Sequence, residues 1–187
     1  MRIARAASTA FHPVTIATAL LGALALAHHA LFVPALLSWL LLTVLPGALL
    51  VWGMRRGIWA DADVSRLKER RTFLPWLSLA AGLAAALGFI LRYPDGLPTA
   101  LLGTFLWLAA ATLVSLSWKI SLHAAAAVGS VGIVAILFGG RAAMWLLWCP
   151  AAVAWSRLVL RRHTLPQVIA GACLGAAAAA AARLMLG

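Results

Sequence analysis

Apolar residues occur in long runs along this chain, and polar residues are confined to the short segments between them. A helix needs about 20 apolar residues to cross the hydrocarbon core of a bilayer. Runs of that kind predict seven helices, at residues 14–33, 35–53, 73–91, 99–117, 123–139, 142–160 and 166–186. The fifth run is short, and only Pro34 separates the first two, so that pair is expected to form a tight hairpin. We therefore predict an all-α, polytopic transmembrane helix bundle with six or seven spanning helices.

The chain is expected to form one integral-membrane domain over residues 1–187, because no soluble domain, linker or repeat interrupts the apolar runs. Arg2 and Arg5 precede the first run, and a basic N-terminus of this kind also begins cleaved signal peptides. Cleavage would require residues 35–53 to be reassigned, so a retained first helix is the simpler interpretation.

Composition and charge agree with a membrane protein. Hydrophobic residues make up 65% of the chain and charged residues 10%, whereas a soluble domain has about a quarter of its residues charged. The chain contains 15 lysines and arginines but only 4 acidic residues, so its net charge is +11. Nucleic-acid binding would need a basic soluble surface. These basic residues instead lie in short clusters beside apolar runs, where they suit membrane flanks and anionic ligands.

The distribution of basic residues also predicts the orientation. Twelve of the 15 lie on the side that holds the N-terminus and the loops 54–72, 118–122 and 161–165. The positive-inside rule places that side in the cytoplasm. We therefore expect an integral protein of the bacterial inner (plasma) membrane.

Few residues are available for chemistry. None of the acids, Asp61, Asp63, Glu69 and Asp95, falls within an apolar run, and a Mg²⁺ enzyme usually needs several converging carboxylates. Asp61, Asp63 and Glu69 are interpreted as balancing a basic loop. Cys149 and Cys173 give neither a metal-binding spacing nor a disulfide framework. We expect no metal ion and no cofactor. The remaining candidates are the histidines His12, His28, His29, His123 and His163.

Three polar clusters, at residues 61–71, 118–123 and 156–171, are predicted on the same side of the membrane. Each combines basic side chains with a hydroxyl or an imidazole, and the last two contain His123 and His163. Two histidines among fixed cations suit phosphoryl transfer, with one imidazole attacking phosphorus and the other protonating the leaving oxygen. Arginine and lysine can carry the charge stabilisation that a metal would otherwise supply. We expect the other three histidines to be structural, with His12 in the N-terminal interface and His28 and His29 near the far one.

Local sequence places His163 at the mouth of the last helix. Thr164 is a plausible N-cap and Pro166 suits the first helical turn, so the helix dipole favours a phosphate at this position. Gln167 follows His163 by four residues and is near enough for its side-chain oxygen to accept a hydrogen bond from the imidazole. Gly171 and Gly175 form a small-xxx-small pair that permits close helix packing.

These clusters resemble motifs of the type-2 phosphatidic acid phosphatase and vanadium haloperoxidase superfamily, over residues 61–175. The third matches the signature S-R-x5-H-x3-D-V-x2-G at Ser156, Arg157, His163, Val168 and Gly171. The second retains Ser121 and His123 of the motif P-S-G-H. The first, D-x4-R-x2-E-R, is similar to a variant of the basic motif in small bacterial members.

The resemblance implies a role for each residue. His163 would be the nucleophile that forms a phosphohistidine, and His123 the general acid for the leaving group. The phosphate would be held by Arg157, Arg70, Lys119, Arg66 and Ser121. Gln167 stands where the family usually has Asp, so it would orient His163 without adding charge and leave it a weaker nucleophile. Asp61 or Asp63 could supply the missing charge from across the bundle.

The expected function is that of a metal-independent lipid phosphate phosphatase with its site on the cytoplasmic side. Its partners would be the bilayer and a lipid phosphate substrate: phosphatidic acid, phosphatidylglycerophosphate or an isoprenyl mono- or diphosphate. Two alternatives stay open. One is a lipid phosphotransferase that uses the same histidine, and the other is a catalytically weak relative that binds lipid headgroups or transports a small molecule. The oligomeric state is also open.

Overall fold

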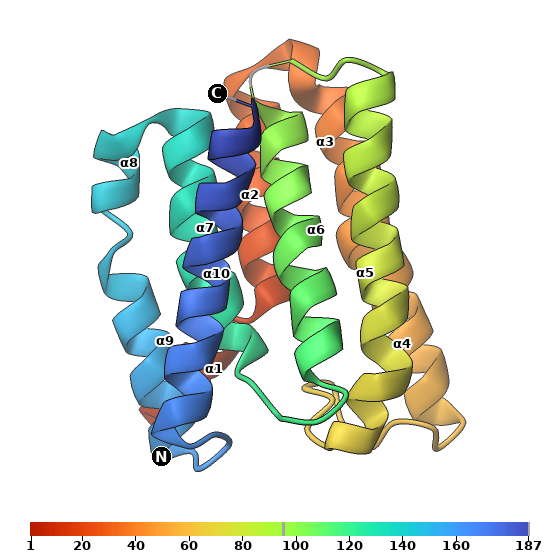
Figure 1. Cartoon of the computed structure of the whole chain (residues 1–187), viewed down its shortest axis with the longest axis vertical. Helices are drawn as coiled ribbons and strands as arrows, with labels where there is room; N and C mark the ends of the chain where they lie inside the picture. Colours follow the sequence, from red (N-terminus) through yellow and green to blue (C-terminus); the bar gives the residue numbers. More distant parts are fainter. Residues whose placement is uncertain (95, 187) are drawn as a thin grey trace.

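A computed structural model describes residues 1–94 and 96–186, and within these residues the regular structure is helical throughout (Figure 1). The helices are α1 Arg2–Ala10, α2 Pro13–Ala27, α3 Phe32–Trp39, α4 Leu45–Arg55, α5 Leu67–Ile90, α6 Leu97–Val114, α7 Leu122–Phe138, α8 Gly140–Met144, α9 Trp148–Val159 and α10 Leu165–Leu186. A 3₁₀ turn at His29–Leu31 precedes α3, and a π-helical turn at Leu40–Val44 joins α3 to α4.

Several helices are long and apolar enough to cross a membrane. Five spans meet that description: His29–Arg55, Leu67–Ile90, Leu97–Val114, Gly140–Val159 and Leu165–Met185. The pair α1 and α2, bent by 46° at Phe11 and His12, qualifies as a sixth when taken together, and α7 is a shorter apolar helix of 17 residues. The prediction of an all-α membrane bundle is confirmed, whereas the described residues form five candidate spans, or six with the bent pair, and not the seven that the apolar runs suggested.

The first hairpin turns at a different residue from the one predicted. The break falls at His28, which has an extended backbone with φ −140° and ψ 106°. Pro34, the predicted breaker, instead lies in the first turn of α3, where a proline is tolerated because the first backbone N–H groups have no helical partner. The residues from His29 to Arg55 therefore form one span.

Small residues bring α7 and α10 into close contact. A Cβ atom at Gly175 would lie 2.2 Å from the carbonyl oxygen of Ala125, and one at Gly132 would lie 2.4 Å from the Cβ of Ala179. Such approaches are possible only where side chains are absent, and in lipid they replace the hydrophobic drive for helix association. The predicted packing role of the glycine pair on α10 is therefore confirmed.

Four segments meet at one end of the bundle, the lower end in Figure 1. They are α1, the loop before α5, the start of α7 and the segment from the end of α9 to the start of α10. The helix α1 packs against α9, where Phe11 and Trp148 form an edge-to-face pair with ring centroids 5.5 Å apart. This end of the bundle holds the polar side chains described next.

Candidate active site

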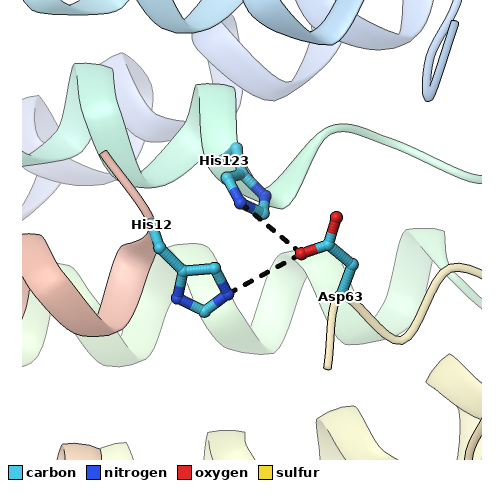
Figure 2. Close-up of side chains that lie close together, drawn as sticks. All are labelled: His12, Asp63 and His123. Carbon is cyan, nitrogen blue, oxygen red and sulfur yellow. Dashed lines mark ion pairs between the residues drawn. The ribbon is translucent and has the colours of Figure 1, made fainter. Parts of the chain in front are cut away.

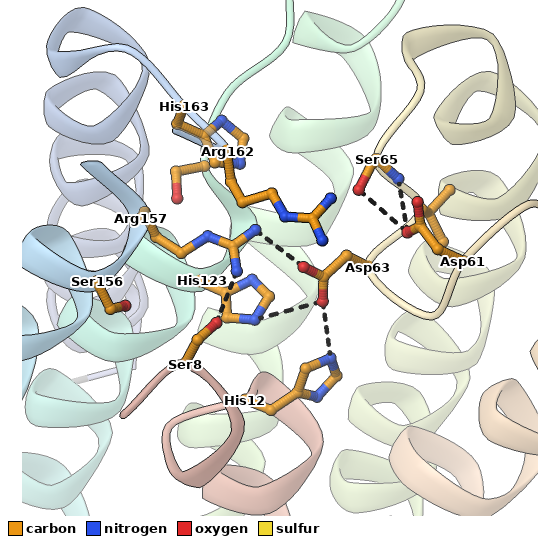
Figure 3. A network of polar contacts seen from close by, with 12 residues as sticks. Ser8, His12, Asp61, Asp63, Ser65, His123, Ser156, Arg157, Arg162 and His163 are labelled. Carbon is orange, nitrogen blue, oxygen red and sulfur yellow. Dashed lines mark hydrogen bonds and ion pairs between the residues drawn. The ribbon is translucent and has the colours of Figure 1, made fainter. Parts of the chain in front are cut away.

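Buried polar side chains from all three sequence clusters converge at this end of the bundle (Figure 3). Arg70 lies near the start of α5, His123 in the first turn of α7, Arg157 near the end of α9 and His163 directly before α10. Each is at most 6% exposed. Because the four residues come from four different segments, the bundle itself sets their relative positions.

His163 is held by Gln167 in the arrangement that the spacing predicts. Nδ1 of His163 lies 3.1 Å from Oε1 of Gln167, and that oxygen also accepts a hydrogen bond of 3.2 Å from the backbone N–H of Thr164. Because an amide oxygen only accepts, Nδ1 of a neutral His163 carries the hydrogen. Nε2 is then left with a free electron pair, as a nucleophile requires.

The surroundings keep His163 uncharged. Its pKa is lowered to about 3, mainly by burial and then by the positive charges of Lys119, Arg70 and Arg157. The hydrogen bond to Gln167 raises the pKa, but this effect is smaller. The pKa of Lys119 is lowered too, first by burial and then by neighbouring cations, and its Nζ donates a 3.1 Å hydrogen bond to the backbone carbonyl of Arg162. The imidazole of His163 is therefore neutral at neutral pH.

The two buried arginines have different partners. Nε of Arg70 donates to the carbonyl of Val64 at 3.0 Å and Nη1 to the carbonyl of Ile120, so this side chain ties α5 to two loops. Arg157 donates from Nη1 to Oγ of Ser8 at 2.8 Å and from Nη2 to Oδ2 of Asp63 at 3.0 Å. Its Nε is buried without a hydrogen-bond partner among the described residues. Since burying a cation is costly, these groups favour an anion in the site.

Asp63 lies at the centre of the cluster and does more than balance a basic loop, although its ion pairs among the described residues go to His12, His123 and Arg157 and not to His163. Its Oδ1 is 3.8 Å from Nε2 of His123 and 3.8 Å from Nε2 of His12 (Figure 2). Its Oδ2 pairs with Arg157 (Figure 3). Burial alone would raise the pKa of Asp63, but the charges of His123 and Arg157 outweigh it and lower the pKa. The carboxylate therefore stays ionised and holds three side chains together.

His12 also belongs to the site, although we expected it in the N-terminal interface. Nδ1 of His12 accepts a 3.3 Å hydrogen bond from the backbone N–H of Val14, which caps α2, so Nε2 faces Asp63. Its ring meets that of His123 edge to face with centroids 5.0 Å apart. Together with Ser8, it brings the N-terminal segment into the cluster. Neither residue carries a sequence signal for this, because each contact depends on the 46° bend between α1 and α2.

Two residues expected to hold phosphate are placed otherwise. The side chain of Arg66 is 73% exposed and pairs with Glu69 at 3.6 Å, because Arg66 caps α5 at the surface. Oγ of Ser121 caps α7 by accepting a 3.3 Å hydrogen bond from the backbone N–H of Ala124. Asp61 bonds to Ser65 within its own loop, in agreement with the local role expected for it. The basic groups left at the centre are Arg70, Arg157 and Lys119.

Three of these side chains offer atoms to a metal ion. One ligand atom from each of His12, Asp63 and His123 lies within 4.8 Å of the others, and imidazole with carboxylate is a donor set that suits Zn²⁺. However, the guanidinium of Arg157 lies 3.0 Å from the second oxygen of the same carboxylate. A divalent cation would be repelled by this charge, whereas the oxyanion of a phosphate would be attracted.

Comparisons of the chain with protein-family models, with curated proteins and with solved structures find no match.

Proposed function

We propose that this protein is a metal-independent phosphatase that hydrolyses a membrane lipid phosphate through a phosphohistidine on His163. The observation that carries the proposal is a buried, neutral imidazole, oriented by Gln167 and surrounded by fixed cations, with a second buried histidine close by. The resemblance of residues 61–175 to the type-2 phosphatidic acid phosphatase superfamily supports the same reaction.

In the first step, Nε2 of His163 attacks phosphorus, and a nitrogen–phosphorus bond forms as the bond from phosphorus to the lipid oxygen breaks. His123 gives a proton to that leaving oxygen. Because His123 is buried beside Arg157, it is neutral in the free protein and takes up this proton together with the anionic substrate. Asp63, 3.8 Å from Nε2 of His123, complements the positive charge that this acid carries. Arg70, Arg157 and Lys119 stabilise the charge on the other phosphate oxygens.

In the second step, water attacks the phosphohistidine. His123, now neutral, accepts a proton from this water, so the acid of the first step is the base of the second. The nitrogen–phosphorus bond breaks, inorganic phosphate leaves and His163 regains its free electron pair. Arg157 would exchange its contacts with Ser8 and Asp63 for phosphate oxygens during the cycle, because a bidentate guanidinium–phosphate pair is stronger than a bond to a hydroxyl.

We place the site on the cytoplasmic side of the bacterial inner membrane. The polar cluster shares its end of the bundle with the N-terminus and the loops 54–72, 118–122 and 161–165, the side on which 12 of the 15 basic residues lie. By the positive-inside rule, that end faces the cytoplasm.

The test is phosphate release by the purified protein from lipid phosphates in mixed micelles, with and without EDTA. We expect equal rates in both conditions and a loss of about a thousandfold or more in His163→Ala. His28→Ala, an exposed histidine at the far end of α2, is the matched control and should keep the wild-type rate. Activity that survives in His163→Ala, or that EDTA abolishes, would overturn the proposal.

One observation favours a second candidate, a protein that binds lipid phosphates without turnover. Gln167 gives His163 a neutral partner, which weakens the nucleophile relative to one paired with a carboxylate. Tight binding of lipid phosphate with no release of phosphate, unchanged by Gln167→Asp, would support this candidate. Transfer of the phosphoryl group to an added alcohol would instead identify a phosphotransferase.

A further inference from the structure

An apolar cavity begins directly at the polar site. A first cavity of about 90 Å³ is lined at one end by His12, Asp63 and His123. A second cavity of about 130 Å³ continues from it into the bundle. The two share five lining residues, namely Pro13, Val14, Leu42, Leu77 and Trp107. The two cavities therefore adjoin each other, and together they are called the passage, which extends from the polar site into the bundle.

The passage runs along the bundle axis. The second cavity follows α6 from Leu108 to Leu97 and α7 from Ala126 to Leu137. Eleven residues of helix rise by about 16 Å, at 1.5 Å per residue, which is roughly half of the hydrocarbon thickness of a bilayer. The passage is therefore long enough for a good part of an extended hydrocarbon chain.

The lining of the passage suits hydrocarbon. Two of its hydroxyls are bonded to their own helix, Thr104 to the carbonyl of Ala100 at 2.9 Å and Ser130 to that of Ala126 at 2.6 Å. Leu42 and Thr43 reach it from the π-helical turn, a feature that recurs at functional sites. Oγ1 of Thr43, in the first cavity, is buried without a partner among the described residues. Elsewhere the walls are mainly aliphatic and aromatic, and such a space takes an apolar ligand rather than water.

We infer that this passage holds the hydrocarbon tail of the substrate and admits a single chain, so that the substrate is a single-chain lipid phosphate. The inference rests on the proposed function. In that function the leaving oxygen, which carries the tail, is protonated by His123, and His123 lies at the polar end of the passage. The order of groups is therefore nucleophile, phosphate, acid and tail.

The cavity at the polar end is small, with a volume of about 90 Å³. It leaves little room for two hydrocarbon chains side by side. A diacylglycerol phosphate branches into two chains next to the phosphate, and both would have to enter at this point. A prenyl or monoacyl lipid brings only one. The structure thus favours the isoprenyl class over phosphatidic acid and phosphatidylglycerophosphate, with lysophosphatidic acid as the other single-chain source.

Two alanines of α2 provide a matched pair of variants. Ala17 lines the passage, whereas Ala19 is exposed on the outer face of the same helix and lines neither cavity. Ala17→Phe fills the space that a tail would occupy, and Ala19→Phe adds the same side chain where lipid surrounds the bundle. Each is compared with wild type on farnesyl phosphate, oleoyl lysophosphatidic acid, dioleoyl phosphatidic acid and the tail-less phenyl phosphate, at matched concentrations.

We expect kcat/KM for a single-chain substrate to exceed that for dioleoyl phosphatidic acid by at least about tenfold. A single tail enters the passage and gains free energy with each buried CH₂ group, whereas the second chain of the diacyl lipid prevents this burial. Ala17→Phe should lower kcat/KM for that substrate by about tenfold or more and leave phenyl phosphate unchanged. Ala19→Phe should change neither. A higher kcat/KM for farnesyl phosphate would identify a prenyl substrate, and a higher kcat/KM for oleoyl lysophosphatidic acid would identify an acyl substrate.

The inference and the proposed function fail in different ways. Equal or better hydrolysis of dioleoyl phosphatidic acid, or no selective loss in Ala17→Phe, would overturn the single-chain passage while the phosphatase stands. If even phenyl phosphate is not hydrolysed by wild type, the proposed function fails. Binding of farnesyl phosphate, weakened by Ala17→Phe but not by Ala19→Phe, would then still support the passage, and equal binding by all three proteins would overturn it.

Discussion

The contact between α7 and α10 at Gly171 offers a direct test of how the two histidines are positioned. A Cβ atom at Gly171 would lie 2.3 Å from the carbonyl oxygen of Ser121, against an ordinary contact of 3.4 Å or more. Gly171→Ala must therefore move the two backbones apart by about 1 Å. The same contact contains the hydrogen bond from the backbone N–H of Ser121 to the carbonyl of Gln167, 3.0 Å long.

The displacement would move both proposed catalytic residues, His123 and His163. Ser121 is two residues from His123, and Gln167 holds His163. A misplacement of this size costs about a hundredfold in rate. Overpacking costs about 1 to 3 kcal/mol, from which the helix propensity gained on replacing glycine recovers about 1 kcal/mol. We expect Gly171→Ala to lose activity by about a hundredfold and up to about 2 kcal/mol of stability.

Phosphate release and thermal unfolding in detergent measure both effects. Gly22→Ala on α2 is the control, because nothing lies within 4 Å of the Cβ it would add. It should keep full activity and gain a little stability. If Gly171→Ala is as active and as stable as Gly22→Ala, close backbone approach does not position the histidines.

Two further changes test the electrostatics of the site. Lys119→Met removes one of the charges that, after burial, hold the pKa of His163 at about 3, so this pKa should rise toward 6.5. Wild-type His163 is neutral above its low pKa, so its protonation should not slow phosphohistidine formation between pH 8 and pH 5. As the pH falls, Lys119→Met should therefore begin to lose its single-turnover rate at a higher pH than wild type, and an identical pH profile in the two proteins would contradict this cause. Asp63→Asn leaves the buried Arg157 without its carboxylate, which should lower the midpoint of thermal unfolding. Inorganic phosphate should raise the midpoint more in this variant than in wild type, and an equal rise would argue against an anion site at Arg157.

The bundle could be predicted because the bilayer constrains it so strongly. Apolar helices satisfy their own backbone hydrogen bonds, so hydropathy alone locates the spans. The contact between His163 and Gln167 is equally local, since it depends only on one turn of helix and its cap. The turn at His28 was missed because a proline marks a helix start as readily as a helix end.

The centre of the site depends on contacts that leave no periodic signal in the sequence. Asp63 reaches Arg157 across 94 positions, from a loop whose path follows no helical or strand pattern. Ser8 and His12 join only because α1 bends away from α2 and packs on α9. Arg66 precedes Arg70 by one helical turn, yet it lies at the surface because it caps the helix.

The hydrogen bond between Ser8 and Arg157 has a consequence for biogenesis. Its two residues are 149 positions apart, so at roughly 5 to 20 residues per second the ribosome makes the second about 7 to 30 s after the first. During that interval the nascent chain lacks Arg157 and His163, so the polar site is incomplete. For the proposed phosphatase this means that hydrolysis begins only after α9 and α10 have been made, and that translation intermediates are inactive toward the surrounding lipids.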